Sequence, residues 1–334
     1  MKLTKPSYFD NFRCIAGKCP DSCCQEWAVQ VDSASAAFYR SLPGALGDRL
    51  RQVLTEENGD TVMQIENRRC PMWREDGLCR IQAELGEAAL CETCHEFPRL
   101  RHDYGSFLEL GLELSCPEAA RLILSDGDCS PVTLDIPGGT EADYDTEAME
   151  ILLSTRETAR ALLADPTRDV PITLALLLMF GLEAQARLDG DETLPFDPEA
   201  ALADAREFAV AADSREIPEF FGSLEILTED WPQYLTDPAP AEWEEDHRKL
   251  ARYFVDRYWL QAVSDYDLYC RIKFVIISCL VIRQVGGNLL RTAQLYSKEI
   301  ENNIDNVETL LDAAYSHPAF TDRKLLGYLL GPEG

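Results

Sequence analysis

Apolar residues recur at helical spacing through most of the chain after residue 145. Residues 146–164 carry them at three- and four-residue intervals, and Asp165-Pro166 ends the pattern because proline cannot continue a helix. A second helix is expected to begin with Pro171 in its first turn and to run to Leu188. Further helical patterns cover residues 198–211, 241–263, 266–285, 289–296, 307–314 and 323–330. Six or more helices with short connections predict an all-helical C-terminal bundle.

The first third of the chain is less regular. Trp27, Val29 and Val31 alternate with polar or small residues, which is typical of a strand, and residues 62–66 form a second short strand candidate. Residues 34–55 and 107–124 are expected to be helical. The front of the chain is therefore interpreted as an irregular unit with minor β structure.

Gly, Pro and acidic residues dominate residues 125–145, which indicates a linker. The predicted organisation is a cysteine-rich metal-cluster domain over residues 1–130, an acidic linker over 131–145 and a helical domain over 146–334. A chain of 334 residues exceeds the usual size of one hydrophobic core, which agrees with two packed units. The predicted fold class is mainly α.

Charge is strongly negative and uneven. The net charge is −28, and residues 1–130 hold 14 basic against 21 acidic residues while residues 131–334 hold 17 against 38. Binding to nucleic acid is not expected, because neutralising phosphates requires clustered Lys and Arg. An acidic surface could attract a basic partner or a lysine-bearing substrate, or could simply keep the protein soluble.

The chain shows no membrane or secretion signal of the usual kinds. Its first ten residues lack an apolar segment followed by a cleavage site, and its longest apolar stretch, residues 172–182, has about half the length that a bilayer requires. We therefore expect a cytoplasmic protein with no membrane association. In such a reducing compartment, clustered cysteines are more often metal ligands or redox groups than disulfides.

Cysteines are the main chemical feature of the front unit. Four occur as Cys14-x4-Cys19-x3-Cys23-Cys24, and the others are Cys70, Cys79, Cys91, Cys94, Cys116, Cys129, Cys270 and Cys279. Thiolates bind Zn²⁺ or iron–sulfur clusters, and proline follows three of these cysteines, which slightly favours iron–sulfur. Adjacent Cys23 and Cys24 point in different directions on most backbones and are poorly suited to one ion. Cys91 and Cys129 are interpreted as surplus thiols, and Cys270 and Cys279 as buried packing residues.

Several segments resemble one known family. They are Phe12-Arg-Cys14-x4-Cys19-x3-Cys23-Cys24-x2-Trp27, Arg69-Cys70-Pro71, Asp76-Gly77-Leu78-Cys79-x-Ile81-Gln82, Cys94-x3-Pro98-Arg99, Glu113-Leu-Ser-Cys116-Pro-Glu-Ala-Ala-Arg121 and Tyr296-Ser-Lys-Glu-Ile-Glu301. Together these resemble the flagellin lysine-N-methylase family. The resemblance implies methylation of flagellin lysines with S-adenosylmethionine as donor and a cysteine-bound [4Fe–4S] cluster, with zinc as the alternative metal. It places Cys14, Cys19, Cys23, Cys24, Cys70, Cys79, Cys94 and Cys116 at the family's cysteine positions.

Lysine methylation also needs a group that accepts a proton, because a free lysine has a pKa near ~10.4. Tyr296, Glu299 and Glu301 are the candidates, and their alternative roles are core packing and helix-surface charge. His95 and Arg99 are candidates to meet the donor's carboxylate. The competing hypothesis is a noncatalytic zinc- or iron-binding or redox-sensing protein, although such a module would not need the long helical part.

Overall fold

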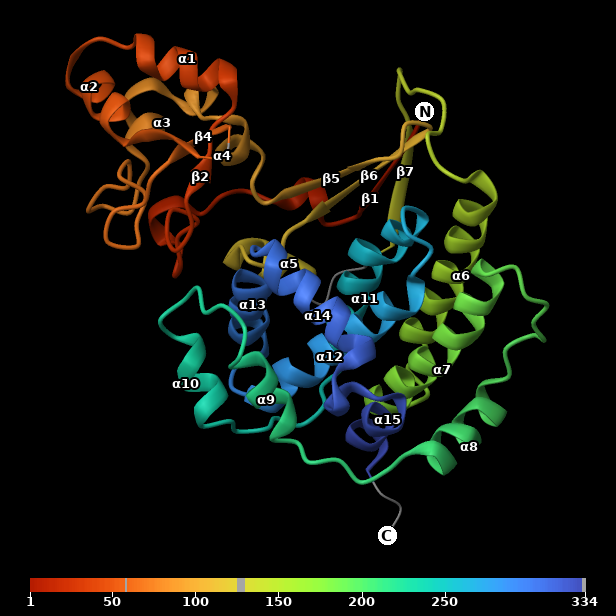
Figure 1. The fold of residues 1–334 in the computed structure, drawn as a ribbon. Coiled ribbons are helices and arrows are strands. Elements are labelled where there is room, and N and C mark those ends of the chain that lie inside the picture. Colours follow the sequence, from red (N-terminus) through yellow and green to blue (C-terminus); the bar gives the residue numbers. More distant parts are fainter. Residues whose placement is uncertain (58, 125–129, 332–334) are drawn as a thin grey trace.

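The computed structural model describes residues 1–57, 59–124 and 130–331, and it is mainly α-helical, as predicted. Its described residues form two hydrophobic cores. Figure 1 shows the two corresponding parts of the fold. The smaller core lies within residues 13–98, here called the small unit. The larger core gathers residues 1–12, 99–124 and 130–331, here called the large unit.

Three short strands and four helices build the small unit. Its sheet has the order β2-β4-β3, formed by Val29–Gln30, Asp60–Met63 and Leu54–Glu57. The helices are α1 (Ser33–Ser41), α2 (Gly44–Val53), α3 (Arg80–Leu85) and α4 (Glu92–Glu96).

The small unit corrects one helix prediction and agrees with a strand prediction. A single helix over residues 34–55 is wrong, because Pro43 lies between α1 and α2 and the chain then turns into β3. The alternating Val29 and Val31 are both buried, and Val29 pairs with Met63 as a strand residue.

A four-stranded sheet connects the small unit to the helices of the large unit. Its order is β5-β6-β1-β7, formed by Arg99–Asp103, Phe107–Leu112, Lys2–Pro6 and Pro131–Asp135. β1 is parallel to β6 and antiparallel to β7. In Figure 1 this sheet extends from the small unit to the N-terminus, above the helices.

This sheet corrects two further predictions. Residues 107–112 form β6, with Leu108 and Leu112 buried on a period-two pattern, so only Pro117–Leu124 is helical (α5). Residues 131–135, predicted as linker, form β7 because they pair along the whole of β1.

Ten α-helices follow in the described part of the chain after β7. They are α6 (Thr146–Ala164), α7 (Val170–Leu188), α8 (Pro198–Phe208), α9 (Glu216–Phe221), α10 (Trp231–Thr236), α11 (Asp246–Tyr258), α12 (Leu268–Val285), α13 (Leu289–Ile300), α14 (Ile304–Ser316) and α15 (Asp322–Leu330). The predicted helices of this part are confirmed, apart from shifts at their ends. The short helices α9 and α10 were not predicted.

The core of the large unit is built around α12, which is buried on nearly all sides. Arg156 of α6 forms two hydrogen bonds with Glu109 of β6, at 2.8 and 2.6 Å, and so fastens the sheet to the helices. Within the described residues, α7 alone is long and apolar enough to cross a membrane, but it packs against α6, α8, α12 and α15, which accounts for its composition.

Candidate functional site

The front cysteine loop, residues 14–24, lies against α13 at the boundary between the two units. Asp21 accepts hydrogen bonds from Lys298 Nζ at 2.9 Å, Gln294 Nε2 at 3.0 Å and Arg291 Nη1 at 3.1 Å. Burial acts to raise the pKa of Asp21, but the Lys298 charge and these hydrogen bonds hold that pKa below its usual value. Lys298 is itself 3% exposed and lies 5.3 Å from the centre of the Trp27 ring. The loop is therefore docked on α13 by a buried ion pair.

Gln294 also brings a distant cysteine beside this loop. Its Nε2 atom donates both to Asp21 and, at 2.7 Å, to the carbonyl oxygen of Ser115, the residue before Cys116. Burial, together with the charges of Cys19 and Cys14, raises the pKa of the Cys116 thiol to about 11. The charges of Cys14 and Cys116 also act on Cys23, so Cys14, Cys19, Cys23 and Cys116 form one neighbourhood, here called the loop group.

A second neighbourhood lies in the small unit. Cys70 donates its backbone N–H to the Cys24 carbonyl oxygen at 2.8 Å, and hydrogen bonds from the thiols of Cys23 and Cys70 lower the pKa of Cys24 to about 3. Cys24, Cys70, Cys79 and Cys91 all pack in the small core. Cys94 follows Cys91 by one turn, and its hydrogen bond lowers the pKa of Cys91 to about 7. Cys24, Cys70, Cys79, Cys91 and Cys94 are here called the core group.

The remaining cysteines lie elsewhere. Cys270 and Cys279 are buried in α12, as the packing interpretation expects, whereas Cys129 falls outside the described residues. Cys91, interpreted from sequence as surplus, is 2% exposed beside the other core-group thiols.

The donor set suits a thiophilic metal, and five of its thiols hydrogen-bond to one another: Cys23 and Cys70 to Cys24, and Cys94 to Cys91. Within residues 1–57, 59–124 and 130–331, no three Cys, His, Asp or Glu side chains are arranged to hold one ion. All the described cysteines are free thiols. Shared metal coordination would therefore require the thiol groups to turn toward a common centre.

The predicted catalytic residues lie on α13 or directly after it, and all three are buried with protein partners. The Tyr296 hydroxyl lies 2.6 Å from Ser278 Oγ in the large core. Glu299 accepts hydrogen bonds from the backbone N–H groups of Leu227 and Thr228, at 2.8 and 2.6 Å. These contacts join α13 to α12 and to the loop before α10, and the catalytic roles of Tyr296 and Glu299 stay predictions.

Glu301 belongs to a buried polar network that sequence reasoning missed. Its carboxylate accepts hydrogen bonds from Tyr258 at 2.9 Å and Tyr253 at 3.0 Å, and it pairs with Arg257 at 3.2 Å. Burial acts to lower the pKa of Arg257, but the Glu301 charge keeps it well above its usual value. Helical spacing places Tyr253 and Arg257 on one face of α11, but only the fold brings Glu301 to that face.

His95 and Arg99, the predicted donor contacts, are both exposed. His95 Nδ1 lies 3.0 Å from a Glu96 carboxylate oxygen, and the Arg99 guanidinium lies 5.3 Å from the centre of the Phe12 ring. Arg99 also donates to the carbonyl oxygen of His95 at 3.5 Å, so the two residues are neighbours on the surface.

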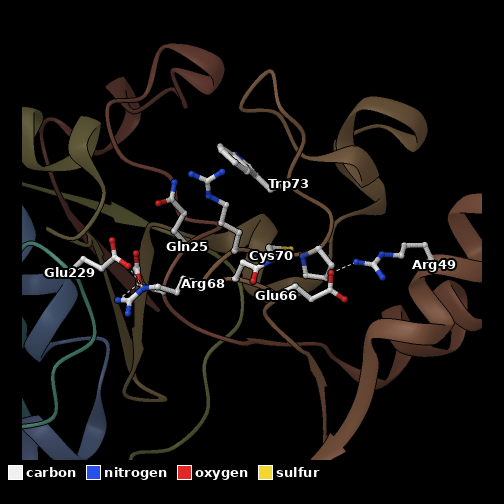
Figure 2. A pocket seen from close by; sticks show the side chains of 11 residues that line it. Gln25, Arg49, Glu66, Arg68, Cys70, Trp73 and Glu229 are labelled. Atoms are coloured by element: carbon white, nitrogen blue, oxygen red, sulfur yellow. Dashed lines mark hydrogen bonds and ion pairs between the residues drawn. The ribbon is translucent and has the colours of Figure 1, made fainter.

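A pocket of about 500 Å³ lies beside Cys70, and Figure 2 shows its lining. Arg68 closes one side by pairing with Glu26 at 2.6 Å and Glu229 at 3.6 Å, which joins the small unit to the loop before α10. On the other side Arg49 pairs with Glu66.

A stacked pair of side chains forms another part of the pocket wall. The Arg69 guanidinium lies 4.0 Å from the centre of the Trp73 ring, and the indole N–H of Trp73 is buried without a hydrogen-bond partner among the described residues. An aromatic face with charges of both signs suits a polar, zwitterionic ligand better than an apolar one. His95 and Arg99 are not among the lining residues.

Part of the chain is similar to flagellar and methylase proteins of Salmonella. The flagellar biosynthetic protein FliU of Salmonella muenchen is 33% identical over 133 residues, which are 38% of this chain and 79% of that protein. The lysine-N-methylases of Salmonella choleraesuis and Salmonella typhimurium are each 32% identical over 133 residues. The match spans 38% of this chain but only 33% of either methylase. No family model and no solved structure matches the chain.

Proposed function

Because the chain belongs to the family of FliU and the lysine-N-methylases, we propose that it is a protein-lysine N-methyltransferase acting on flagellin. In this proposal S-adenosylmethionine supplies the methyl group, and the clustered cysteines bind metal, including an iron–sulfur cluster. The observation that carries the proposal is the contact between the two separated segments that resemble the family. Asp21 of the cysteine loop pairs with Lys298 of the Tyr296–Glu301 segment.

The reaction requires a neutral lysine amine that attacks the methyl group of a sulfonium. Withdrawing the lysine from water lowers its pKa, whereas nearby carboxylates raise it, so acidic residues serve capture more than activation. The net charge of −28 supports capture of a basic substrate segment. A bound cluster would supply either an iron that holds the methionine end of the donor or a rigid support for the pocket.

We propose that the pocket beside Cys70 holds the amino-acid end of the donor. The carboxylate of that group would pair with Arg69, and its ammonium would lie near Glu26 or Glu66. This assignment replaces His95 and Arg99, which lie outside the pocket. Arg69→Ala is expected to raise the KM for S-adenosylmethionine, while His95→Ala and Arg99→Ala leave that KM nearly unchanged.

Tyr296, Glu299 and Glu301 are proposed to position the site rather than to accept the proton. Glu299 holds the loop that ends in Glu229 at the pocket wall, and Tyr296 fixes α13 beneath the cysteine loop. The proton of the lysine would then pass to a pocket carboxylate or to water.

The test starts with anaerobic purification, a visible spectrum and metal analysis. The protein is then incubated with methyl-labelled S-adenosylmethionine and flagellin, and label is expected on flagellin lysines. Cys70→Ser should abolish labelling, whereas Cys270→Ala, in α12, is the matched control and should retain it. Absence of label despite bound metal would overturn the methylase proposal and favour the noncatalytic metal-binding alternative. Colourless protein loaded with zinc would overturn the iron–sulfur part alone.

A further inference from the structure

We propose that the cysteines form two separate metal centres rather than one. The loop group, Cys14, Cys19, Cys23 and Cys116, would form the first. The second would take Cys24, Cys70 and Cys79 from the core group, with one ligand from the Cys91 and Cys94 pair of α4. The inference rests on the metal-binding part of the proposed function and is independent of methyl transfer.

The backbone sets the two groups in different parts of the fold. Cys116 directly precedes α5 and packs against the large core. Cys24, Cys70, Cys79 and Cys91 pack in the small core. Gln294 holds the loop and the Ser115 carbonyl oxygen together from α13, so the loop group lies at the boundary between the units. A single four-ligand centre cannot use all nine thiols.

Local hydrogen bonds gather the core group from four separate segments. The hydrogen bond from the Cys70 N–H to the Cys24 carbonyl oxygen joins the segments of these two cysteines. A backbone bridge between Trp73 and Cys79 brings the Cys79 segment beside Cys70. The side chain of Thr93, between the two cysteines of α4, donates to the Gln30 carbonyl oxygen at 2.9 Å and ties α4 to β2. Cys70 and Cys91 are 7% and 2% exposed and Cys24 and Cys79 are partly buried, so most of this centre would be shielded from water, as structural zinc sites are.

The division also explains why Cys23 and Cys24 are adjacent. Two neighbouring residues rarely point at one ion, but they can supply one ligand to each of two adjacent centres. Cys24 is joined to Cys70 through backbone and thiol, while the Cys23 thiol contacts the Cys24 thiol and also lies near Cys14 and Cys116. The pair would then be the covalent link between the two centres.

The two centres differ in what they can do. The core group would be closed and structural, the role that suits Zn²⁺ in a tetrathiolate shell. The loop group includes the exposed Cys14 and Cys23 and lies on α13, beside the buried Lys298, so a cluster there would be accessible to a ligand. This assigns the iron–sulfur cluster of the proposed enzyme to the loop group.

The test is metal stoichiometry in matched single variants of the full chain. Wild type, Cys79→Ser, Cys116→Ser and the control Cys279→Ala are purified anaerobically, and iron, zinc and sulfide per chain are measured together with the visible spectrum. Cys79→Ser is expected to lose zinc and keep the iron chromophore, and Cys116→Ser is expected to do the reverse. Circular dichroism identifies a variant that has failed to fold, and for such a variant Cys91→Ser/Cys94→Ser or Cys14→Ser is used instead.

Other outcomes overturn the proposal. Loss of all metal in both single variants, or wild-type protein that contains a single centre, would show that the thiols serve one site. Failure of methyl transfer would not affect this result, because the readout is metal bound to the protein.

Discussion

The two units of the molecule are stabilised by different means. The large unit buries a continuous apolar core around α12 and fills it with leucine, isoleucine and aromatic side chains. The small unit buries far fewer apolar side chains, and cysteines are among them. A core with so few buried apolar side chains gives limited hydrophobic stabilisation, and a bound metal can add to it because its binding free energy contributes to folding. We infer that the large unit folds through packing and that the small unit depends on its thiols.

Metal removal is expected to produce the largest difference in stability between the two units. Structural zinc sites contribute on the order of 10 kcal/mol. Treatment with a chelator under anaerobic conditions should abolish amide-exchange protection in β2–β4 and α1–α4 while leaving α6, α7 and α12 protected, as measured by exchange mass spectrometry. Equal loss of protection in both units would contradict the comparison.

Breaking the buried Arg257–Glu301 ion pair of the large unit is expected to have the next largest effect on stability. Arg257→Met leaves the Glu301 carboxylate buried without its cation and should cost about 3–5 kcal/mol in the free energy of unfolding. The control is Arg121→Met, because Arg121 pairs with Glu118 at the surface and should cost under about 1 kcal/mol. Urea unfolding followed by circular dichroism gives both values. A similar cost for both variants would show that the network is not important for the core.

The contact between the units is tested by Asp21→Asn. The change weakens the hydrogen bonds that the buried Asp21 carboxylate accepts and leaves Lys298 without its ion pair. The expected cost in the free energy of unfolding is about 1–3 kcal/mol. Asp230→Asn is a matched control, because Asp230 also pairs with Arg291 but is largely exposed. Limited proteolysis between the units should become faster in Asp21→Asn only. Equal rates in the two variants would mean that the pair does not hold the units together.

The smallest expected effect is a pH dependence at Glu299. Burial raises the pKa of this carboxyl above its usual value near 4.5, although the N–H groups of Thr228 and Leu227 act against the shift. Between these two values the unfolded chain has lost the proton while the folded protein retains it, so the stability of the wild type falls as pH rises through that window. Glu299→Gln does not titrate there, and its stability relative to wild type should increase across the same range. Parallel pH profiles from urea unfolding would contradict this.

Sequence patterns predicted the features that depend on neighbouring residues. Residues 146–164 form α6 with the predicted bounds, because apolar spacing and the following Asp-Pro are local signals. Cysteine spacing predicted a metal-binding unit at the front of the chain, and metal binding there stays a prediction.

Features that depend on distant residues could not be predicted. β7 was interpreted as linker because its five residues carry no signal by themselves and become a strand only through pairing with β1. Asp21 and Lys298 are 277 positions apart, and nothing in either segment indicates the other. The hydrogen-bond partners of Tyr296 and Glu299 likewise come from another helix and a distant loop.

The central claim, that this chain methylates flagellin lysines, is tested most directly by peptide mass spectrometry of flagellin. Flagellin is co-expressed with the wild-type chain, with Cys70→Ser or with Cys270→Ala, and each lysine-containing peptide is compared. The account predicts peptides heavier by whole methyl groups, localised to lysine, with the wild type and Cys270→Ala but not with Cys70→Ser. Unmodified flagellin beside folded, metal-loaded wild-type protein would contradict it.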